Sequence, residues 1–81
     1  MQHYARLSSN PRLRRTLRVL QAANGALTTY ELMRKAKICA VSSVVSELRN
    51  NGAEITCRQE VTNGQRRFYY ILIKSPEGYN A

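Results

Sequence analysis

The chain has 81 residues, with 13 Lys and Arg against 5 Asp and Glu, which gives a formal net charge of +8 at pH 7. A chain of this length forms one small hydrophobic core and has no room for a second. Its 43% hydrophobic content argues against wholesale disorder. The excess of positive charge favours a polyanion as partner, and the alternative is a soluble basic protein whose charge serves no partner.

Several classes of protein are not expected. The first residues lack the apolar run of a secretory signal, and the longest apolar run, 68–73, is far shorter than a membrane span. One histidine, His3, and two cysteines are too few for a zinc site. We therefore expect no metal, no cofactor and no membrane. Without an acid–base pair or a phosphate loop, we also expect no enzyme and no small-molecule substrate.

The first predicted element is a helix over residues 11–23. Asn10 can cap its free amide groups, and Pro11 suits the first helical position because it has no N–H to satisfy. Leu13, Leu17 and Leu20 follow at helical spacing. The residues before this helix, 1–9, show no periodicity, and we expect them to be flexible.

Two further helices follow. Thr28 and Glu31 predict a capping box for a helix over residues 29–36, in which Leu32, Met33 and Ala36 are the inward candidates. A tight turn then leads to a helix over residues 40–50. Its apolar face is predicted from the helical spacing of the side chains Val41, Val44, Val45 and Leu48.

The remaining elements are strands. Alternating residues predict a half-buried strand from 55 to about 61, and Asn63-Gly64 is a strong hairpin turn. The return strand covers 66–73, with apolar residues on both faces, as in a strand with neighbours on both sides. Leu27 could supply a short third strand. The end of the chain, 74–81, is a predicted flexible tail. Cys39 and Cys57 have apolar neighbours, and we expect them to be reduced core residues.

The order of helix, short strand, two helices and hairpin resembles a winged helix-turn-helix, an α+β fold, over residues 10–73. Gly-Ala-Leu-Thr at 25–28 and Glu-Leu-Arg-Asn-Asn-Gly at 47–52 are similar to motifs that flank these helices in phage- and prophage-type domains of that family. The resemblance implies a regulator or accessory factor that binds double-stranded DNA in the bacterial cytoplasm. It also implies that the third helix enters the major groove and the hairpin, or wing, contacts the backbone.

Twelve residues are the resulting candidates for DNA contact, and three regions supply them. The end of the second helix contributes Arg34, Lys35 and Lys37. The polar face of the third helix contributes Ser42, Ser43, Ser46, Arg49 and Asn50. The hairpin contributes Arg58, Gln65, Arg66 and Arg67. Serine discriminates bases poorly, so modest sequence readout is expected. The competing interpretation is that the serines form an ordinary solvated face and that the arginines protect an exposed strand.

Two questions stay open at this level. The basic cluster of the first helix, Arg12, Arg14, Arg15 and Arg18, has no obvious duplex to contact, and a solvated face explains it equally well. The fold also serves as a protein–protein adaptor, so a host or phage protein is an alternative partner, with exposed tyrosines as anchors. A homodimer is possible, although no dimerisation helix is evident.

Overall fold

The computed structural model describes residues 6–79. Its elements are, in chain order, a 3-10 turn η1 (Leu7–Ser9), helix α1 (Pro11–Ala22), strand β1 (Leu27–Thr28), helices α2 (Thr29–Ala36) and α3 (Val41–Asn50), and strands β2 (Glu54–Thr62) and β3 (Gln65–Lys74). The fold class is α+β, with three helices and a three-stranded antiparallel sheet. The predicted helix and strand bounds agree with these to within one or two residues.

The helices begin where the sequence predicts. The side chain of Asn10 accepts hydrogen bonds from the backbone N–H groups of Arg12 and Leu13 at the start of α1. At the start of α2, Thr28 and Glu31 form the reciprocal capping box. α2 ends at Lys37, whose φ of 56° is left-handed, and this conformation turns the chain sharply into the segment before α3.

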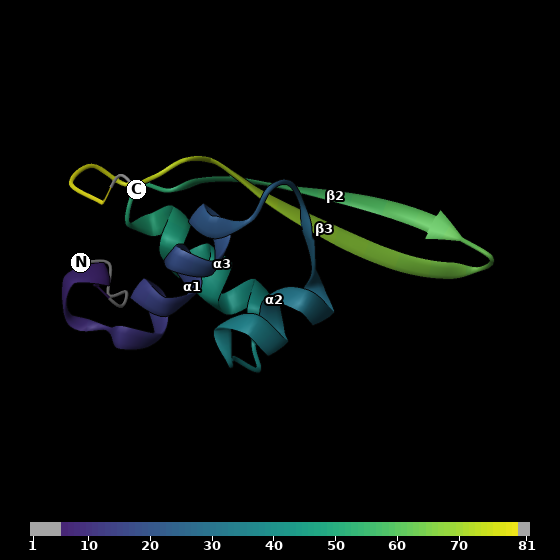
Figure 1. Ribbon diagram of the computed structural model, residues 1–81, viewed down its shortest axis with the longest axis horizontal. Coiled ribbons are helices and arrows are strands. Elements are labelled where there is room, and N and C mark those ends of the chain that lie inside the picture. Colours follow the sequence, from purple (N-terminus) through teal and green to yellow (C-terminus); the bar gives the residue numbers. More distant parts are fainter. Residues whose placement is uncertain (1–5, 80–81) are drawn as a thin grey trace.

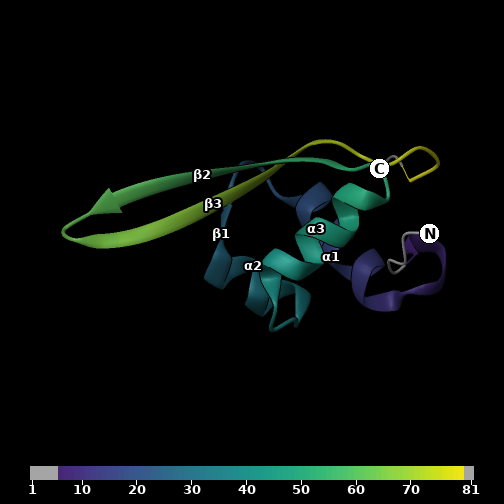
Figure 2. The ribbon, with the colours of Figure 1, turned by 180° about the vertical axis from the view of Figure 1, so that it is seen from behind.

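The sheet has the strand order β1-β3-β2, so β3 is the central strand and the prediction of neighbours on both sides is confirmed. Leu27 supplies the third strand and lies opposite Tyr70. Asn63 and Gly64 both have positive φ, 52° and 76°, as in a type I′ turn. Beyond β1, the β2–β3 hairpin projects well past the helices (Figure 1). The same projection is clear from behind (Figure 2).

The core lies between the three helices and the proximal part of the sheet. The inward faces predicted for α1 and α3 are buried, and in α2 Leu32 and Ala36 are buried while Met33 is half-buried. In β2, however, Ile55 alone among the strand's residues is buried. The expectation of a half-buried strand is therefore wrong for most of β2, because the hairpin extends past the helices that would cover its inner face.

Both ends of the described chain pack against the body, within the segments 1–9 and 74–81 for which the sequence predicts flexibility. Leu7 is buried, and its backbone N–H donates to the Asn51 side chain at 3.0 Å. Pro76 is buried, and the carbonyl of Tyr79 accepts a hydrogen bond from Gln21 of α1. Residues 1–5 and 80–81 lie outside the described part.

Candidate functional site

A groove runs between α3 and the inner face of the hairpin. Ser42, Ser46 and Arg49 form its α3 side, and Cys57, Phe68 and Tyr70 form its strand side. Alternation along the strands explains this lining, because residues opposite one another in the register share a face. Cys57 pairs with Tyr70 and Gln59 pairs with Phe68, so their side chains point to the face that carries the core.

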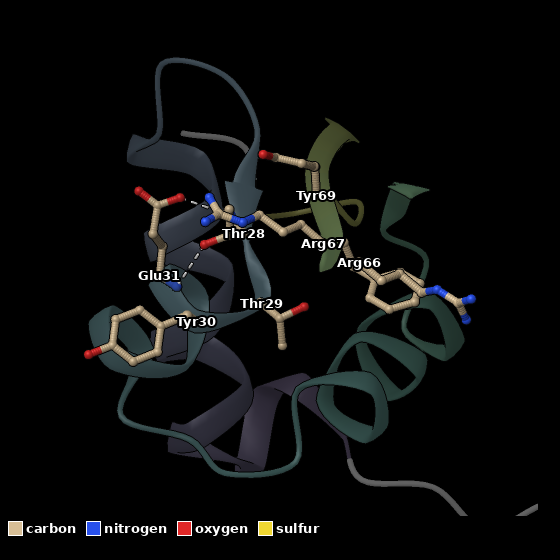
Figure 3. Close-up of a pocket in the computed structure, with 8 residues that line it drawn as sticks. Thr28, Thr29, Tyr30, Glu31, Arg66, Arg67 and Tyr69 are labelled. Carbon is tan, nitrogen blue, oxygen red and sulfur yellow. Dashed lines mark hydrogen bonds between the residues drawn. The ribbon is translucent and has the colours of Figure 1, made fainter. Parts of the chain in front are cut away.

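A second groove lies between the start of α2 and the distal part of β3. Its lining comes from two short segments, Thr28, Thr29, Tyr30 and Glu31 on one side and Arg66, Arg67, Phe68 and Tyr69 on the other. Figure 3 shows the Arg66 and Arg67 side chains leaving β3 in opposite directions, with Arg67 running toward the start of α2. Thr29 and Phe68 line both grooves, which together make one concave surface between the helices and the hairpin.

One carboxylate lies within this surface. Glu31 accepts a hydrogen bond from the Thr28 backbone N–H at 2.9 Å, and its own N–H donates to the Thr28 hydroxyl at 3.1 Å. The backbone and side chain of Thr28 lower the pKa of Glu31; slight desolvation opposes this, and Lys35 lowers it further. Glu31 is thus anionic at neutral pH and belongs to the helix cap, so a polyanion in the groove would meet one negative charge beside the arginines.

Residues on α3 divide into three groups. Ser42 and Ser46 are exposed and line the groove, whereas Ser43 and Asn50 are exposed outside it. Arg49 lines the groove too, and its guanidinium donates to the Ile55 carbonyl through Nε at 3.2 Å and Nη2 at 2.8 Å. These hydrogen bonds fasten the end of α3 to the start of β2.

The hairpin residues do not all face the same way. Arg66 pairs with Val61 and shares the inner face, while Arg67 and Arg58 belong to the outer face. Arg58 forms an ion pair with Glu60 at 3.2 Å and lies over the ring of Tyr69 at 5.4 Å. Gln65 closes the turn opposite Thr62. Although Arg67 belongs to the outer face, its side chain runs toward the start of α2, so both Arg66 and Arg67 line the second groove (Figure 3). Arg58 and Gln65 line neither groove.

The basic residues at the end of α2 are exposed but lie outside the two grooves. Arg34 stacks over Tyr30, with 5.8 Å between the guanidinium carbon and the ring centre. Lys35 contributes to the low pKa of Glu31. Lys37 holds the left-handed position that ends the helix. These three residues form a basic border beside the turn that leads into α3.

The arginine cluster of α1 is partly structural. Arg15 donates from Nε to the Ala36 carbonyl and from Nη2 to the Lys37 carbonyl at 3.3 Å, which satisfies carbonyl groups at the end of α2. Arg14 donates to the carbonyls of Leu7 and Ser8. Arg12 and Arg18 are exposed. The solvated-face interpretation therefore fits these two, whereas Arg14 and the exposed Arg15 also hold backbone carbonyl groups of other segments.

Cys39 and Cys57 are free thiols, in agreement with the predicted reduced state, but their predicted place in the core is wrong. Both are exposed and line the α3 groove. Beside these thiols, burial raises the pKa of the Tyr70 hydroxyl. The neighbouring Cys57 raises this pKa as well, whereas the Thr29 side chain lowers it.

Sequence reasoning missed Thr29, Tyr30 and Phe68 as groove residues. The position of Tyr30 directly after the helix cap was the available signal, because first-turn side chains opposite the core are exposed.

Comparison with protein-family models, with curated proteins and with solved structures gave no match to this chain. Within residues 6–79, no helix is long and apolar enough to cross a membrane. The same part of the chain contains no group of three His, Cys, Asp or Glu side chains placed to hold a metal ion.

Proposed function

We propose that the protein is a winged helix-turn-helix protein that binds double-stranded DNA and acts as a phage or prophage regulator or accessory factor in the bacterial cytoplasm. The observation that carries this proposal is the concave surface, which has the exposed polar face of α3 on one side and Arg66 and Arg67 of the hairpin on the other. A helix and a projecting hairpin in this relation suit a major groove and its flanking phosphates.

The distribution of charge supports DNA over an uncharged partner. Basic side chains border both ends of the proposed interface, with Arg34, Lys35 and Lys37 beside the turn before α3 and Arg66 and Arg67 on β3. The exposed residues of α3 itself are small and uncharged, so they allow close approach to base edges but distinguish bases weakly. We therefore expect affinity to come mainly from phosphate contacts.

Salt dependence tests this expectation. If about four to six phosphates are neutralised, log K for duplex DNA falls with log salt concentration with a slope of roughly −4 to −5. Replacing Arg66 and Arg67 together by Ala lowers affinity and reduces the magnitude of that slope by about 2. The matched control replaces Arg12 and Arg18 by Ala, since this removes the same charge from exposed α1 positions that line neither groove.

Equal losses in the two double variants would show that net charge, and not the concave surface, governs binding. Absence of duplex binding at low salt would refute the proposal and favour the protein–protein adaptor. A specific observation supports that second candidate, because Ile71 and Ile73 lie exposed on the sheet, with 36% and 56% of their surface accessible. The affinity for a protein partner that covers these two isoleucines would be unaffected by the Arg66 and Arg67 substitutions.

A further inference from the structure

The outer edge of the hairpin is an open strand edge. β2 is the last strand of the sheet, and every residue from Thr56 to Thr62 is exposed. Proteins usually protect such an edge with charged side chains, above all Lys, with Pro, with a very short strand or with a bulge. β2 has neither Lys nor Pro, runs for 9 residues, and has its only register shift at its start, between Glu54 and Ile55.

The type I′ turn determines which backbone groups face that edge. In this turn the carbonyl of Thr62 accepts from the N–H of Gln65, so these two residues are a hydrogen-bonded pair. Bonded and non-bonded pairs alternate along an antiparallel ladder. Thr62, Glu60, Arg58 and Thr56 therefore direct their backbone groups toward β3. Cys57, Gln59 and Val61 direct theirs toward the open edge, where they are available to another strand. Ile55 faces the same edge, but its carbonyl already accepts hydrogen bonds from Arg49.

The side chains of this edge are complementary to a second copy of themselves. A two-fold axis through Gln59 pairs Gln59 with Gln59 of the second copy, Cys57 with Val61, and Thr56 with Thr62. It also places Arg58 of each copy opposite Glu60 of the other. Arg58 and Glu60 already share the outer face, where they form an ion pair in one chain at 3.2 Å. The edge-directed residues 57, 59 and 61 fall opposite one another, as an antiparallel ladder requires.

Neighbouring registers lack this complementarity. An axis through Arg58 would place two arginines face to face, and an axis through Glu60 would place two glutamates face to face; like charges directly opposite are destabilising. A two-fold axis midway between two neighbouring residues would place each residue whose backbone groups face the open edge opposite one whose groups face β3, so the hydrogen bonds of the ladder could not form. The Gln59 register also covers part of Val61, which is 63% exposed in the single chain.

We propose that two copies of this chain associate through antiparallel pairing of their β2 strands about Gln59, forming a continuous six-stranded sheet. The two-fold axis is perpendicular to the sheet, so the inner faces of the two copies, with their helices, lie on the same side. The interface is a single strand pair, and association is therefore weak and dependent on concentration. This inference does not rest on DNA binding, and its test contains no DNA.

Charge reversal tests the register directly. Sedimentation of the full chain over a range of concentrations should show a monomer–dimer equilibrium. Arg58→Glu and Glu60→Arg each turn both cross-strand pairs from attractive to repulsive, which weakens self-association by roughly tenfold or more. Mixing the two variants restores the attraction, because the two arginines on β2 of one variant then face the two glutamates on β2 of the other. The mixture should form heterodimers, which differently tagged chains make visible.

The controls separate pairing from folding. Side chains at 58 and 60 are 66% and 46% exposed, so both variants should keep the circular dichroism spectrum of the parent. Gln59→Pro removes an edge-directed N–H without touching the β3 ladder, and it should abolish dimers. A monomer at every concentration would overturn the inference. Dimers that tolerate either reversal, or a mixture that gains no heterodimer, would overturn it as well.

Discussion

Replacing Arg15 by Ala tests whether α1 stabilises the end of α2. The guanidinium of Arg15 donates to the carbonyls of Ala36 and Lys37, 21 and 22 positions away in the chain. Hydrogen bonds from a charged donor contribute about 1.5–3 kcal/mol to stability. Because Arg15 is itself exposed to water, we expect a discounted loss of about 1–2 kcal/mol in the free energy of unfolding.

A loss of this size is measurable. In a domain of this length, 1 kcal/mol corresponds to a change in Tm of about 4–8 °C. The unfolding midpoint of Arg15→Ala should therefore fall by roughly 5–15 °C in a thermal melt followed by circular dichroism. Arg15→Lys should lie between parent and Ala, since it keeps the charge but loses the planar set of donors that reaches two carbonyls.

Arg18→Ala is the matched control for this experiment. It removes the same charge from the same helix, and within residues 6–79 the structure gives Arg18 no hydrogen bond or ion pair. Its stability should stay within about 0.5 kcal/mol of the parent. If Arg15→Ala and Arg18→Ala melt together, the contact with α2 contributes nothing and the reasoning is refuted.

Four other predictions concern the elements that position the site. Thr28→Ala should cost about 1 kcal/mol in urea unfolding by removing the helix cap. Because the pKa of its partner Glu31 is lowered in the folded state, the advantage of the parent over Glu31→Gln should be present above pH 4.5 and vanish as the pH falls through the lower folded pKa. An advantage that persists in acid would contradict this assignment. Lys37→Gly should raise the free energy of unfolding by up to about 1 kcal/mol, because the φ of 56° at this position is left-handed and favours glycine. The same substitution should weaken duplex binding if Lys37 contacts phosphate. Unchanged affinity for duplex DNA would remove Lys37 from the interface. Leu48→Ala, at a site that is 0% exposed, should cost about 2–5 kcal/mol, and a smaller loss would show that the core under α3 collapses to fill the space.

The sequence predicts most of the fold because its signals are local. Asn10-Pro11 and the Thr28 capping box mark helix starts within a few residues of the chain, and Asn63-Gly64 determines the hairpin turn. The candidate site is less predictable, because its surface combines α2, α3 and β3. Ser42 and Arg66 are both candidates for DNA contact only through the resemblance to a known fold, because no local pattern relates α3 to the distal part of β3.

The errors share one physical cause, which is that exposure depends on tertiary geometry. Cys57 has apolar neighbours in the sequence, yet in the structure it is exposed in the groove between α3 and the hairpin. The hydrogen bonds from Arg49 to the Ile55 carbonyl are a further feature that the sequence does not reveal, because they require β2 to lie beside α3. The packing of Tyr79 against α1 likewise involves contacts more than 50 positions apart, which no local pattern reveals.

The position of the chain ends has a practical consequence. Leu7, Asn51, Pro76 and Tyr79 line one small depression, so the first and last described segments meet at the end of α3. That corner lies at the opposite end of the molecule from the hairpin turn (Figure 1). A fluorophore or a surface linker attached at this corner would therefore leave both the concave surface and the β2 edge open, so protein immobilised there is suitable for measuring either interaction.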